Sequence, residues 1–291
     1  MTQPPPSKKT LDSSIYKHVF RALPSQKNCY LCPNMNNNPI GVFDSGMGGL
    51  SVWRELRRRL PAESIAYYGD GAHCPYGEKP PHEVLTYIED GVRTLLEHNA
   101  KLIVIACNTA TMTAVKYLRQ KYDLPIVGME PALKPAALST QTGVVGVLAT
   151  HATLNSDWFD ALRSRYDANV RIVSAVGHGF VEAVENGRET APETRRLVEE
   201  ALQPIIAAGA DRIVLGCTHY PFLADRIAEV MSGTGAMIID PAPAVARHTQ
   251  TLLNQFALTA EDDNTPRFEF FSAAGSDYVD RLRRKADSLS N

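Results

Sequence analysis

The sequence predicts an α/β fold of two similar domains, each a parallel sheet flanked by helices, related by a pseudo-twofold axis with a cleft between them. Short apolar runs alternate with amphipathic helical patterns, as in chains whose parallel strands are connected by helices. The pattern also repeats weakly. Gly41 and the residues after it recur at Gly146, 105 positions later, and the strand that ends before Cys107 recurs before Cys217, 110 positions later.

Eight segments have the apolar, β-branched composition of buried strands. Four lie in the first half, at Ile40–Phe43, Ser64–Tyr68, Leu102–Ala106 and Pro125–Val127. Four more lie in the second half, at Val144–Ala149, Val170–Val176, Arg212–Gly216 and Ala236–Asp240. Each run is short and precedes a helical pattern or a turn, so the order along the chain is that of alternating strands and helices.

Amphipathic helices are expected between these strands. Apolar residues recur with helical spacing across Leu50–Leu60, Val84–Leu96 and Leu197–Ile206. The last of these follows Thr190 and Glu193, which have the spacing of a capping box. Two further helical patterns follow Cys107 and Cys217.

Composition and charge exclude several classes of protein. The 291 residues carry 30 basic and 32 acidic side chains, a formal net charge of −2. Without a basic stripe, nucleic-acid binding has little support. No apolar stretch approaches the roughly 20 residues that span a bilayer, and the N-terminus lacks the apolar core of a signal peptide. We therefore expect neither nucleic acid nor membrane as a partner, and a cytoplasmic location.

Residues 1–38 are expected to be a disordered extension, because they contain a PPP run and scattered polar residues that could not cover a core. Met35 is a plausible alternative translation start. Cys29 and Cys32 form a CxxC in this segment. It lacks the strand–helix context and the second ligand pair of a redox or metal site, so we expect no such site there.

Cys107 and Cys217 are the strongest candidates for chemistry. Each follows a predicted strand and precedes a helical pattern. The carboxyl ends of parallel strands are where open α/β sheets build their sites, and a nearby helix N-terminus favours a thiolate. Either cysteine alone could be a buried residue at a strand end. Two at matching places in a repeated pattern are hard to explain as packing.

Two opposed thiols suit proton exchange on both faces of one carbon, one acting as thiolate base while the other is the acid. Donors are then needed for a carboxylate and for developing negative charge, and Ser45, Asn108, Thr109 and Thr218 fit that need. Asp44 could bind an ammonium group or orient Cys107, or simply cap a helix. His219 lies two residues after Cys217, on the same side if the backbone is extended, or it is an ordinary loop histidine.

At these residues the chain resembles the glutamate racemases, from about Pro39 to Ala246. The shared motifs are GVFDSGMGGLSV at Gly41–Val52, PYG at Pro75–Gly77, CNTA at Cys107–Ala110 and GCTHYP at Gly216–Pro221. CNT alone is shared with aspartate racemases and other two-cysteine relatives. The full set, in this order, is specific to the glutamate enzymes.

The resemblance implies a two-base mechanism with no cofactor, neither pyridoxal phosphate nor metal. Cys107 would take the proton from D-glutamate and Cys217 from L-glutamate, supplying D-glutamate for peptidoglycan and suggesting a bacterial source. The implied glutamate-binding residues are Asp44, Ser45, Tyr76, Gly77, Asn108, Thr109, Thr150, Thr153, Thr218 and His219. Asp70 and Glu185 match supporting acid/base positions, although either could be a surface or capping carboxylate. Cys74 is expected to be a bystander near the cleft.

The resemblance also implies domain boundaries and a possible activator. Residues 39–130 plus 240–291 would form the first domain and 131–239 the second, in a monomer or homodimer. The stretch that contains Arg119, Gly128 and Lys134 resembles that of the proteobacterial racemases activated by UDP-N-acetylmuramoyl-L-alanine. In those enzymes the activator would bind at the domain hinge, through these three positions. Arg119 and Lys134 could equally be solvated helix charges.

Three other interpretations stay open at this stage. The chain could be an aspartate or hydantoin racemase, or a decarboxylase, of the same superfamily. It could be a non-catalytic protein that keeps a two-lobed amino-acid site. Finally, Cys107, Cys217 and His219 could bind zinc, although they lack the close ligand pairs of structural zinc sites.

Overall fold

The computed structural model describes residues 37–166 and 170–289, which belong to one compact unit, Asn34–Asn291. Most of the expected extension, including Cys29 and Cys32, therefore lies outside the described residues. Its end is described: the side chain of Asn37 donates from Nδ2 to Glu261 Oε2 (3.1 Å), and its Oδ1 accepts the Glu261 N–H (3.1 Å). None of the described helices is both long and apolar enough to cross a membrane.

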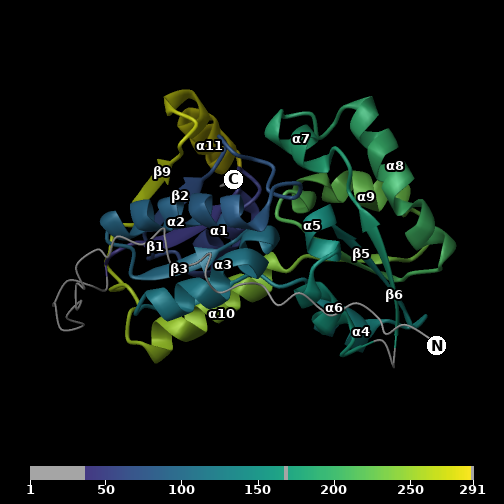
Figure 1. The fold of residues 1–291 in the computed structure, drawn as a ribbon, viewed down its shortest axis with the longest axis horizontal. Coiled ribbons are helices and arrows are strands. Elements are labelled where there is room, and N and C mark those ends of the chain that lie inside the picture. Colours follow the sequence, from purple (N-terminus) through teal and green to yellow (C-terminus); the bar gives the residue numbers. More distant parts are fainter. Residues whose placement is uncertain (1–36, 167–169, 290–291) are drawn as a thin grey trace, which may run out of the picture. The chain divides into compact units, whose positions relative to one another are not determined.

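Two parallel sheets carry the described part of the fold (Figure 1). The first has the order β4-β3-β1-β2-β9, built from β1 (Ile40–Asp44), β2 (Ile65–Gly69), β3 (Leu102–Ile105), β4 (Ile126–Gly128) and β9 (Phe268–Phe271). The second has the order β6-β5-β7-β8, built from β5 (Val144–Ala149), β6 (Arg171–Val176), β7 (Arg212–Gly216) and β8 (Met237–Ile239). All eight predicted strands are confirmed, and β9 was not predicted.

The repeat seen in the sequence is present in the topology. Read from the other edge, the second sheet runs β8-β7-β5-β6, which is the order β4-β3-β1-β2 shifted by four strands. Cys107 lies two residues after the end of β3, and Cys217 is the residue that follows β7. The two cysteines therefore occupy equivalent places in the two sheets. The predicted α/β class with two similar parallel-sheet halves is confirmed.

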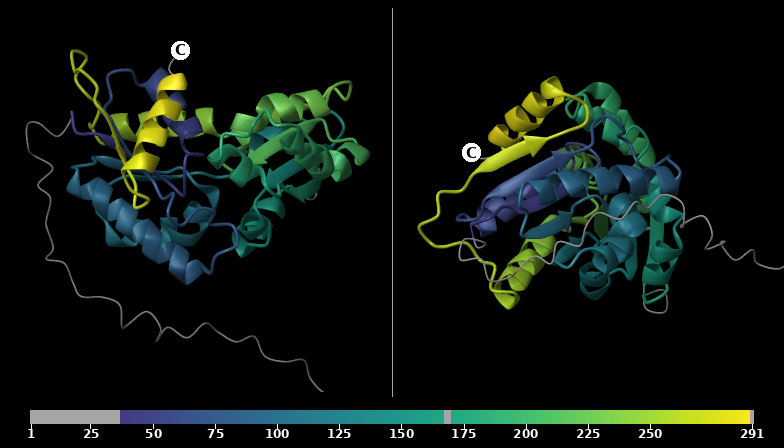
Figure 2. Two further views of the ribbon diagram at one scale, coloured as in Figure 1. Left: turned by 90° about the horizontal axis from the view of Figure 1, so that it is seen from above. Right: turned by 60° about the vertical axis from the view of Figure 1, so that its left-hand side comes forward.

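Alternate residues of the first sheet enter two different cores, which explains why its strands are apolar throughout. Ile40 and Val42 of β1 pack with Trp53, while Phe43 packs with Ile88 on the other face. The first face carries α1 (Leu50–Arg59), α10 (Ala242–Gln255) and α11 (Ser276–Ser288). The second carries α2 (Pro81–Glu97) and α3 (Asn108–Lys121) (Figure 2).

The second sheet is covered in the same way. Ile213 and Leu215 of β7 face one core, and Val214 between them faces the other. Helices α7 (Phe180–Glu185), α8 (Pro192–Ala207) and α9 (Ala224–Val230) pack on the first of these faces, while α4 (Leu133–Ser139), α5 (His151–Leu154) and α6 (Asp157–Arg163) lie against the second. The strand ends are thus held rigidly from both sides.

Two local expectations were wrong. Helix α8 begins at Pro192 with Ala191 as its N-cap and no side-chain cap, so Thr190 and Glu193 form no capping box. Proline suits the first helical position because its missing N–H would have no partner there. The second concerns only the start of the helix after Cys217. The predicted helical pattern is present as α9, but a 3₁₀ turn, Tyr220–Leu223, precedes it.

Candidate active site

Asp44 joins the loop after β1 to the loop after β7. Its carboxylate is fully buried and accepts a hydrogen bond from the Gly46 N–H at 2.9 Å. The Thr218 hydroxyl donates to its other oxygen at 3.0 Å. Burial raises the pKa of Asp44 to about 6, against the opposing effects of the His219 charge and the Gly46 and Thr218 hydrogen bonds. Asp44 is thus both an anchor between the two loops and a carboxylate that titrates near neutral pH.

The glycines that follow Asp44 make room for side chains from the other half of the chain. A Cβ on Gly46 would lie 2.1 Å from Glu185 Oε1, and a Cβ on Gly48 would lie 2.4 Å from His219 Nδ1. Real Cβ contacts do not come this close. Glycine at these two positions of the DSGMGG segment therefore leaves space for the side chains of Glu185 and His219.

Cys107 is the N-cap of α3. Its thiol is buried and accepts a long hydrogen bond from the Ala110 N–H at 3.5 Å. Burial is the main reason that its pKa rises to about 12, and the charge on Asp44 adds to this, while hydrogen bonds from Ala110 and Ser45 act in the opposite direction. The helix-terminus prediction is therefore confirmed for Cys107, but burial outweighs its effect on the thiol.

Cys217 depends on a different neighbour. Because no α-helix begins next to it, the helix-terminus argument was wrong for this cysteine. His219 also has helical backbone angles, φ −74° and ψ −29°, so the predicted extended segment is a turn instead. The turn still brings the two side chains together, with Cys217 Sγ 3.8 Å from His219 Nδ1.

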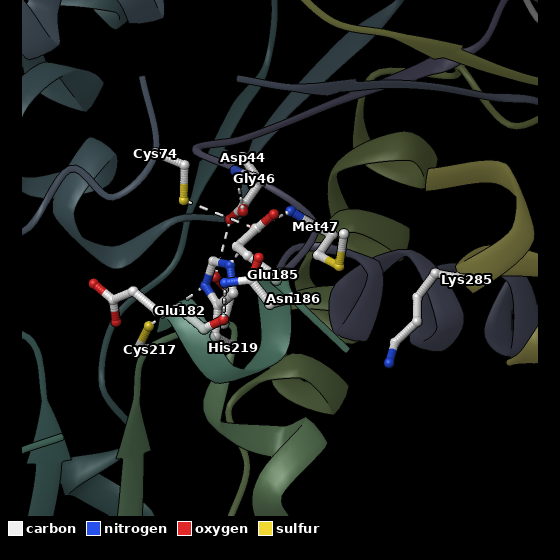
Figure 3. A network of polar contacts seen from close by, with 12 residues as sticks. Asp44, Gly46, Met47, Cys74, Glu182, Glu185, Asn186, Cys217, His219 and Lys285 are labelled. Atoms are coloured by element: carbon white, nitrogen blue, oxygen red, sulfur yellow. Dashed lines mark hydrogen bonds and ion pairs between the residues drawn. The ribbon is translucent and has the colours of Figure 1, made fainter. Parts of the chain in front are cut away.

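Glu185 connects His219 to two other segments, the loop after β1 and α11 (Figure 3). Its Oε1 lies 2.7 Å from His219 Nε2 and accepts the Met47 N–H at 2.8 Å. Its Oε2 accepts the Tyr278 hydroxyl of α11 at 2.7 Å. Glu185, for which the resemblance implies a supporting acid/base role, thus contacts His219 and does not itself line the pocket that contains the two cysteines.

The pKa values of His219 and Glu185 move apart, as in a buried ion pair. Burial lowers the pKa of His219, but hydrogen bonds to Cys217, Cys74 and Glu185 outweigh it and raise that pKa well above its usual value. Burial raises the pKa of Glu185, but the hydrogen bond and charge of His219, with the Met47 and Tyr278 donors, outweigh it and hold the pKa below its usual value. His219 is thus a cation beside the Cys217 thiol.

One pocket contains both cysteines, with a cavity volume of about 20 Å³. Its lining includes nine of the residues singled out from the sequence, namely Ser45, Tyr76, Gly77, Cys107, Asn108, Thr109, Thr150, Cys217 and His219. It also includes Pro75, Val181 and Gly216. Pro75 and Gly216 lie within motifs already quoted, whereas Val181 gave no signal in the sequence.

Polar groups line the pocket in two sets. Thr109 Oγ1 lies 3.3 Å from Thr150 Oγ1, which lies 2.9 Å from Thr153 Oγ1. Thr153 is fully buried and therefore reaches the pocket only through Thr150. In the second set, Asn108 donates to Met129 Sδ at 3.2 Å, while its buried Oδ1 has no hydrogen-bond partner among the described residues. A buried acceptor without a partner is costly, so a bound donor would satisfy it.

Asp70 supports the pocket rather than lining it. It is buried and accepts the Tyr76 hydroxyl at 2.6 Å, and His73 Nδ1 lies 2.9 Å from its other oxygen. Burial raises the pKa of Tyr76, and the Asp70 charge adds to this, so the phenol stays neutral. Cys74, expected to be a bystander, donates its S–H to Glu185 Oε1 at 3.7 Å. Burial raises the pKa of Cys74 to about 12.

The three residues proposed for an activator lie elsewhere. The Arg119 guanidinium donates two hydrogen bonds to the Ile126 carbonyl, at 2.9 and 3.1 Å. A Cβ on Gly128 would lie 2.8 Å from Thr111, so this glycine allows α3 to pack against β4. Lys134 is exposed in the first turn of α4. None of the three lines the pocket described above.

The potential zinc site differs from the one considered from the sequence. Among the described residues, the group whose ligand atoms lie together contains His219 with Cys74 and Glu185. Cys107 and Cys217 are not in that group. The interpretation of the two cysteines as zinc ligands was therefore wrong.

Comparison with known proteins agrees with this geometry. Residues 40–249 match the Asp/Glu/hydantoin racemase family. A glutamate racemase from Herpetosiphon aurantiacus is 44% identical over 250 residues, which are 86% of this chain and 98% of the relative. One from Pseudomonas aeruginosa is 48% identical over 231 residues, 79% of this chain and 87% of the relative.

Solved structures give the same result. The Escherichia coli glutamate racemase in complex with L-glutamate and the activator UDP-MurNAc-Ala has a TM-score of 0.77 at 32% identity, covering 87% of this chain and 95% of that one. A glutamate racemase isoform from Bacillus anthracis has a TM-score of 0.77 at 30% identity, with the same coverage. The chain therefore belongs to the glutamate racemases of the Asp/Glu/hydantoin racemase family, the cofactor-independent isomerases that interconvert L- and D-glutamate.

Proposed function

We propose that Cys107 and Cys217 are the two bases of this racemase, acting on opposite faces of the glutamate α-carbon. The observation that carries the proposal is that both thiols line one pocket, each from the equivalent loop of a repeated sheet. Inverting a stereocentre by proton transfer requires a base on one face and an acid on the other. Two thiols at equivalent positions of the repeated sheets would supply those two groups.

In the direction from L- to D-glutamate, the Cys217 thiolate removes the α-proton and the Cys107 thiol protonates the other face. The cation at His219, 3.8 Å from the Cys217 sulfur, stabilises the thiolate of Cys217. Glu185 is a positioning residue, because it holds the ring through Nε2 and leaves Nδ1 facing the sulfur. In the reverse direction the Cys107 thiolate is the base and the Cys217 thiol is the acid.

The ammonium group of glutamate would bind between Asp44 and Asn108. The Asn108 Oδ1 offers a buried acceptor that lacks a partner, and Asp44 offers a buried negative charge. Neutralisation of the Asp44 charge by the substrate ammonium group would also affect the Cys107 thiol. The Asp44 charge helps to raise the pKa of Cys107, so an ammonium group beside Asp44 would remove that contribution and favour the Cys107 thiolate when substrate is bound.

The carboxylates would be held mainly by neutral donors. Ser45, Thr109, Thr150, Tyr76 and the backbone of Gly77 surround the pocket, and neither lysine nor arginine occurs in its lining. Hydroxyl and amide donors stabilise negative charge on the substrate without placing a positive charge beside the two thiols. We assign three residues to positioning, because each forms a hydrogen bond with one neighbour. Thr218 holds Asp44, and Thr153 holds Thr150. Asp70 holds Tyr76.

Circular dichroism tests the assignment. Purified protein with L-glutamate and no added cofactor should lose the optical signal, and Cys107→Ala and Cys217→Ala should each abolish that loss. Cys74→Ala is the matched control, since it removes a thiol next to the pocket that is neither base. Full activity in either of the first two variants would overturn the two-base assignment.

We further propose that UDP-N-acetylmuramoyl-L-alanine activates this enzyme through Arg119, Gly128 and Lys134. Arginine and lysine donate well to diphosphate and carboxylate groups, and the Escherichia coli relative was solved with UDP-MurNAc-Ala as activator. Two observations weigh against it, since Arg119 already donates to Ile126 and the exposed Glu130 would repel an anion. Turnover with and without the compound, repeated with Lys134→Ala, decides the matter, and high basal turnover that the compound leaves unchanged would refute it.

The physiological setting follows from the chemistry. We propose that the enzyme supplies D-glutamate for peptidoglycan and works in the cytoplasm, where a reducing environment keeps both catalytic thiols free. We also propose that residues 39–130 with 240–291 form one domain and 131–239 the other. The membership of the two sheets, with β9 joining the first sheet and β5 to β8 forming the second, supports this division.

A further inference from the structure

We propose that Cys74, Glu185 and His219 form an inhibitory binding site for Zn²⁺ at the edge of the active site. The site is separate from racemisation, which needs no metal. Its existence depends only on the three side chains, whereas its effect on turnover rests on the role proposed above for His219.

The three side chains offer the ligand types that zinc prefers. A thiolate, an imidazole and a carboxylate, with a fourth position left to water, make the donor set of an open zinc site. One ligand atom from each residue lies within 4.8 Å of the others. Such a set does not arise from a single helix face, because Cys74, Glu185 and His219 come from three different loops or helices of the two halves.

The distances between ligand atoms are close to those of a tetrahedral site. Zinc with a bond of about 2.3 Å to sulfur and about 2.0–2.1 Å to nitrogen and oxygen separates its ligand atoms by about 3.3–3.6 Å. Cys74 Sγ is 3.7 Å from Glu185 Oε1, and His219 Nε2 is 2.7 Å from the same oxygen. The ion therefore requires the nitrogen–oxygen pair to separate by about 0.6 Å, which side-chain rotation can supply.

The hydrogen bonds of this cluster show what the ion replaces. Cys74 donates its S–H to Glu185, and His219 Nε2 shares a proton with the same carboxylate (Figure 3). Zn²⁺ would form bonds to the Cys74 sulfur, the His219 nitrogen and the Glu185 oxygen, and release the thiol proton and one imidazolium proton to solvent. The Met47 N–H and the Tyr278 hydroxyl would still donate to Glu185, so the carboxylate stays in place.

Binding at this site would impair Cys217. Because the ion bonds Nε2 and requires it to separate from Glu185 Oε1 by about 0.6 Å, it displaces the His219 ring from its position 3.8 Å from the Cys217 sulfur. The site is open to solvent through Cys74 and Glu185, which are only partly buried, while His219 is buried. Zinc would therefore act as a reversible inhibitor of turnover.

Cobalt provides a direct test of the ligands, because a thiolate–Co²⁺ bond has a charge-transfer absorption band. The experiment uses the full-length chain with Cys29→Ser and Cys32→Ser, so that the CxxC cannot contribute the band. We expect one Co²⁺ per chain with such a band, its loss in Cys74→Ala, and its retention in Cys217→Ala. A band that survives Cys74→Ala but disappears in Cys217→Ala would overturn the assignment, as would no band at all.

Turnover then tests the consequence in the same background. Zn²⁺ should inhibit racemisation, a chelator should restore it, and Cys74→Ala should retain turnover while the inhibitory concentration of Zn²⁺ rises at least about tenfold. Equal sensitivity of Cys74→Ala and its parent would refute inhibition through this site. If both cysteine bases prove wrong while the cobalt band still depends on Cys74, the metal site stands and the proposed mechanism falls.

Discussion

Gly48→Ala should lower the rate of catalysis in a protein that still folds. The added Cβ would lie 2.4 to 2.7 Å from three atoms of the His219 ring, whereas ordinary van der Waals contacts are 3.4–4 Å. Relief of the closest contact thus needs a displacement of about 1 Å. The ring is buried and tied to Glu185 at 2.7 Å, so the displacement moves the cation away from its position beside Cys217.

The size of the effect follows from that displacement. A misplacement of 1 Å at a reacting group costs up to about 100-fold in rate, which corresponds to about 2.7 kcal/mol in the activation free energy. The contact also destabilises the fold, by about 1–3 kcal/mol for an overpacked buried site. Both numbers concern one methyl group, so no new charge or hydrogen bond complicates the comparison.

Gly143→Ala is the matched control. Gly143 has φ +73°, and no heavy atom lies within 4 Å of its added Cβ. Its substitution should cost about 1–2 kcal/mol of stability through backbone strain alone, with kcat/KM unchanged below the melting temperature. Steady-state kinetics in both directions and thermal melts of the two variants make the comparison. Wild-type kcat/KM in a folded Gly48→Ala protein would refute the argument that the glycine makes room for His219.

Three further predictions follow from the same site. Asp44, with a pKa raised to about 6, is needed as a carboxylate, so kcat/KM should fall as pH drops through about 6, and Asp44→Asn should remove this acidic limb while lowering turnover throughout. Tyr278→Phe removes a 2.7 Å hydrogen bond to Glu185, worth about 1.5–3 kcal/mol when the acceptor is charged. The substitution should slow proton transfer to and from Cys217 alone. Proton removal from L-glutamate then becomes more rate-limiting and proton removal from D-glutamate less so, which raises the primary isotope effect for α-deuterated L-glutamate and lowers that for the D-enantiomer. Equal changes in the two isotope effects would contradict this role of Tyr278. Deletion of Met1–Asn34 removes no described residue, so folding and turnover should persist, and a large loss of either would show that the segment has a structural role.

The sequence predicted the strands and both cysteines because their signals are local. A buried parallel strand is apolar on both faces, and the residue after it falls at a fixed edge of the sheet. Every residue of Ile40–Asp44 and Arg212–Gly216 is buried, and each strand has one charged residue, at one end. The end of each strand could therefore be located within a residue or two, together with Asp44, Cys107 and Cys217.

Contacts between distant segments could not be predicted in the same way. Phe268–Phe271 is a four-residue strand with a glutamate inside it, and only its pairing with β2 identifies it. The roles of Gly46 and Gly48 depend on Glu185 and His219, more than 130 positions away, and no local pattern reveals what approaches a glycine. The same applies to Tyr278 and Glu185, which are 93 positions apart.

Helical and turn geometry after Cys217 shows a third limit. The sequence suggested an extended backbone from Cys217 to His219 and a helix start after it. Instead, His219 has helical backbone angles and Tyr220–Leu223, which includes Pro221, forms a 3₁₀ turn. The contact between Cys217 and His219 is nevertheless present, because a tight turn also brings residues two apart to one side. The residue pair was predicted correctly for a geometric reason that was wrong.

The two-base claim is tested most directly by racemisation of L-glutamate in deuterated water, stopped early and analysed for α-deuterium in each enantiomer. Two separate bases predict that the D-glutamate formed carries deuterium, delivered by Cys107 from solvent, while the recovered L-glutamate keeps its α-protium. A single base serving both faces would instead return protium to the product, or deuterate both enantiomers alike. Either of those results would contradict the assignment of Cys107 and Cys217 to opposite faces of the α-carbon.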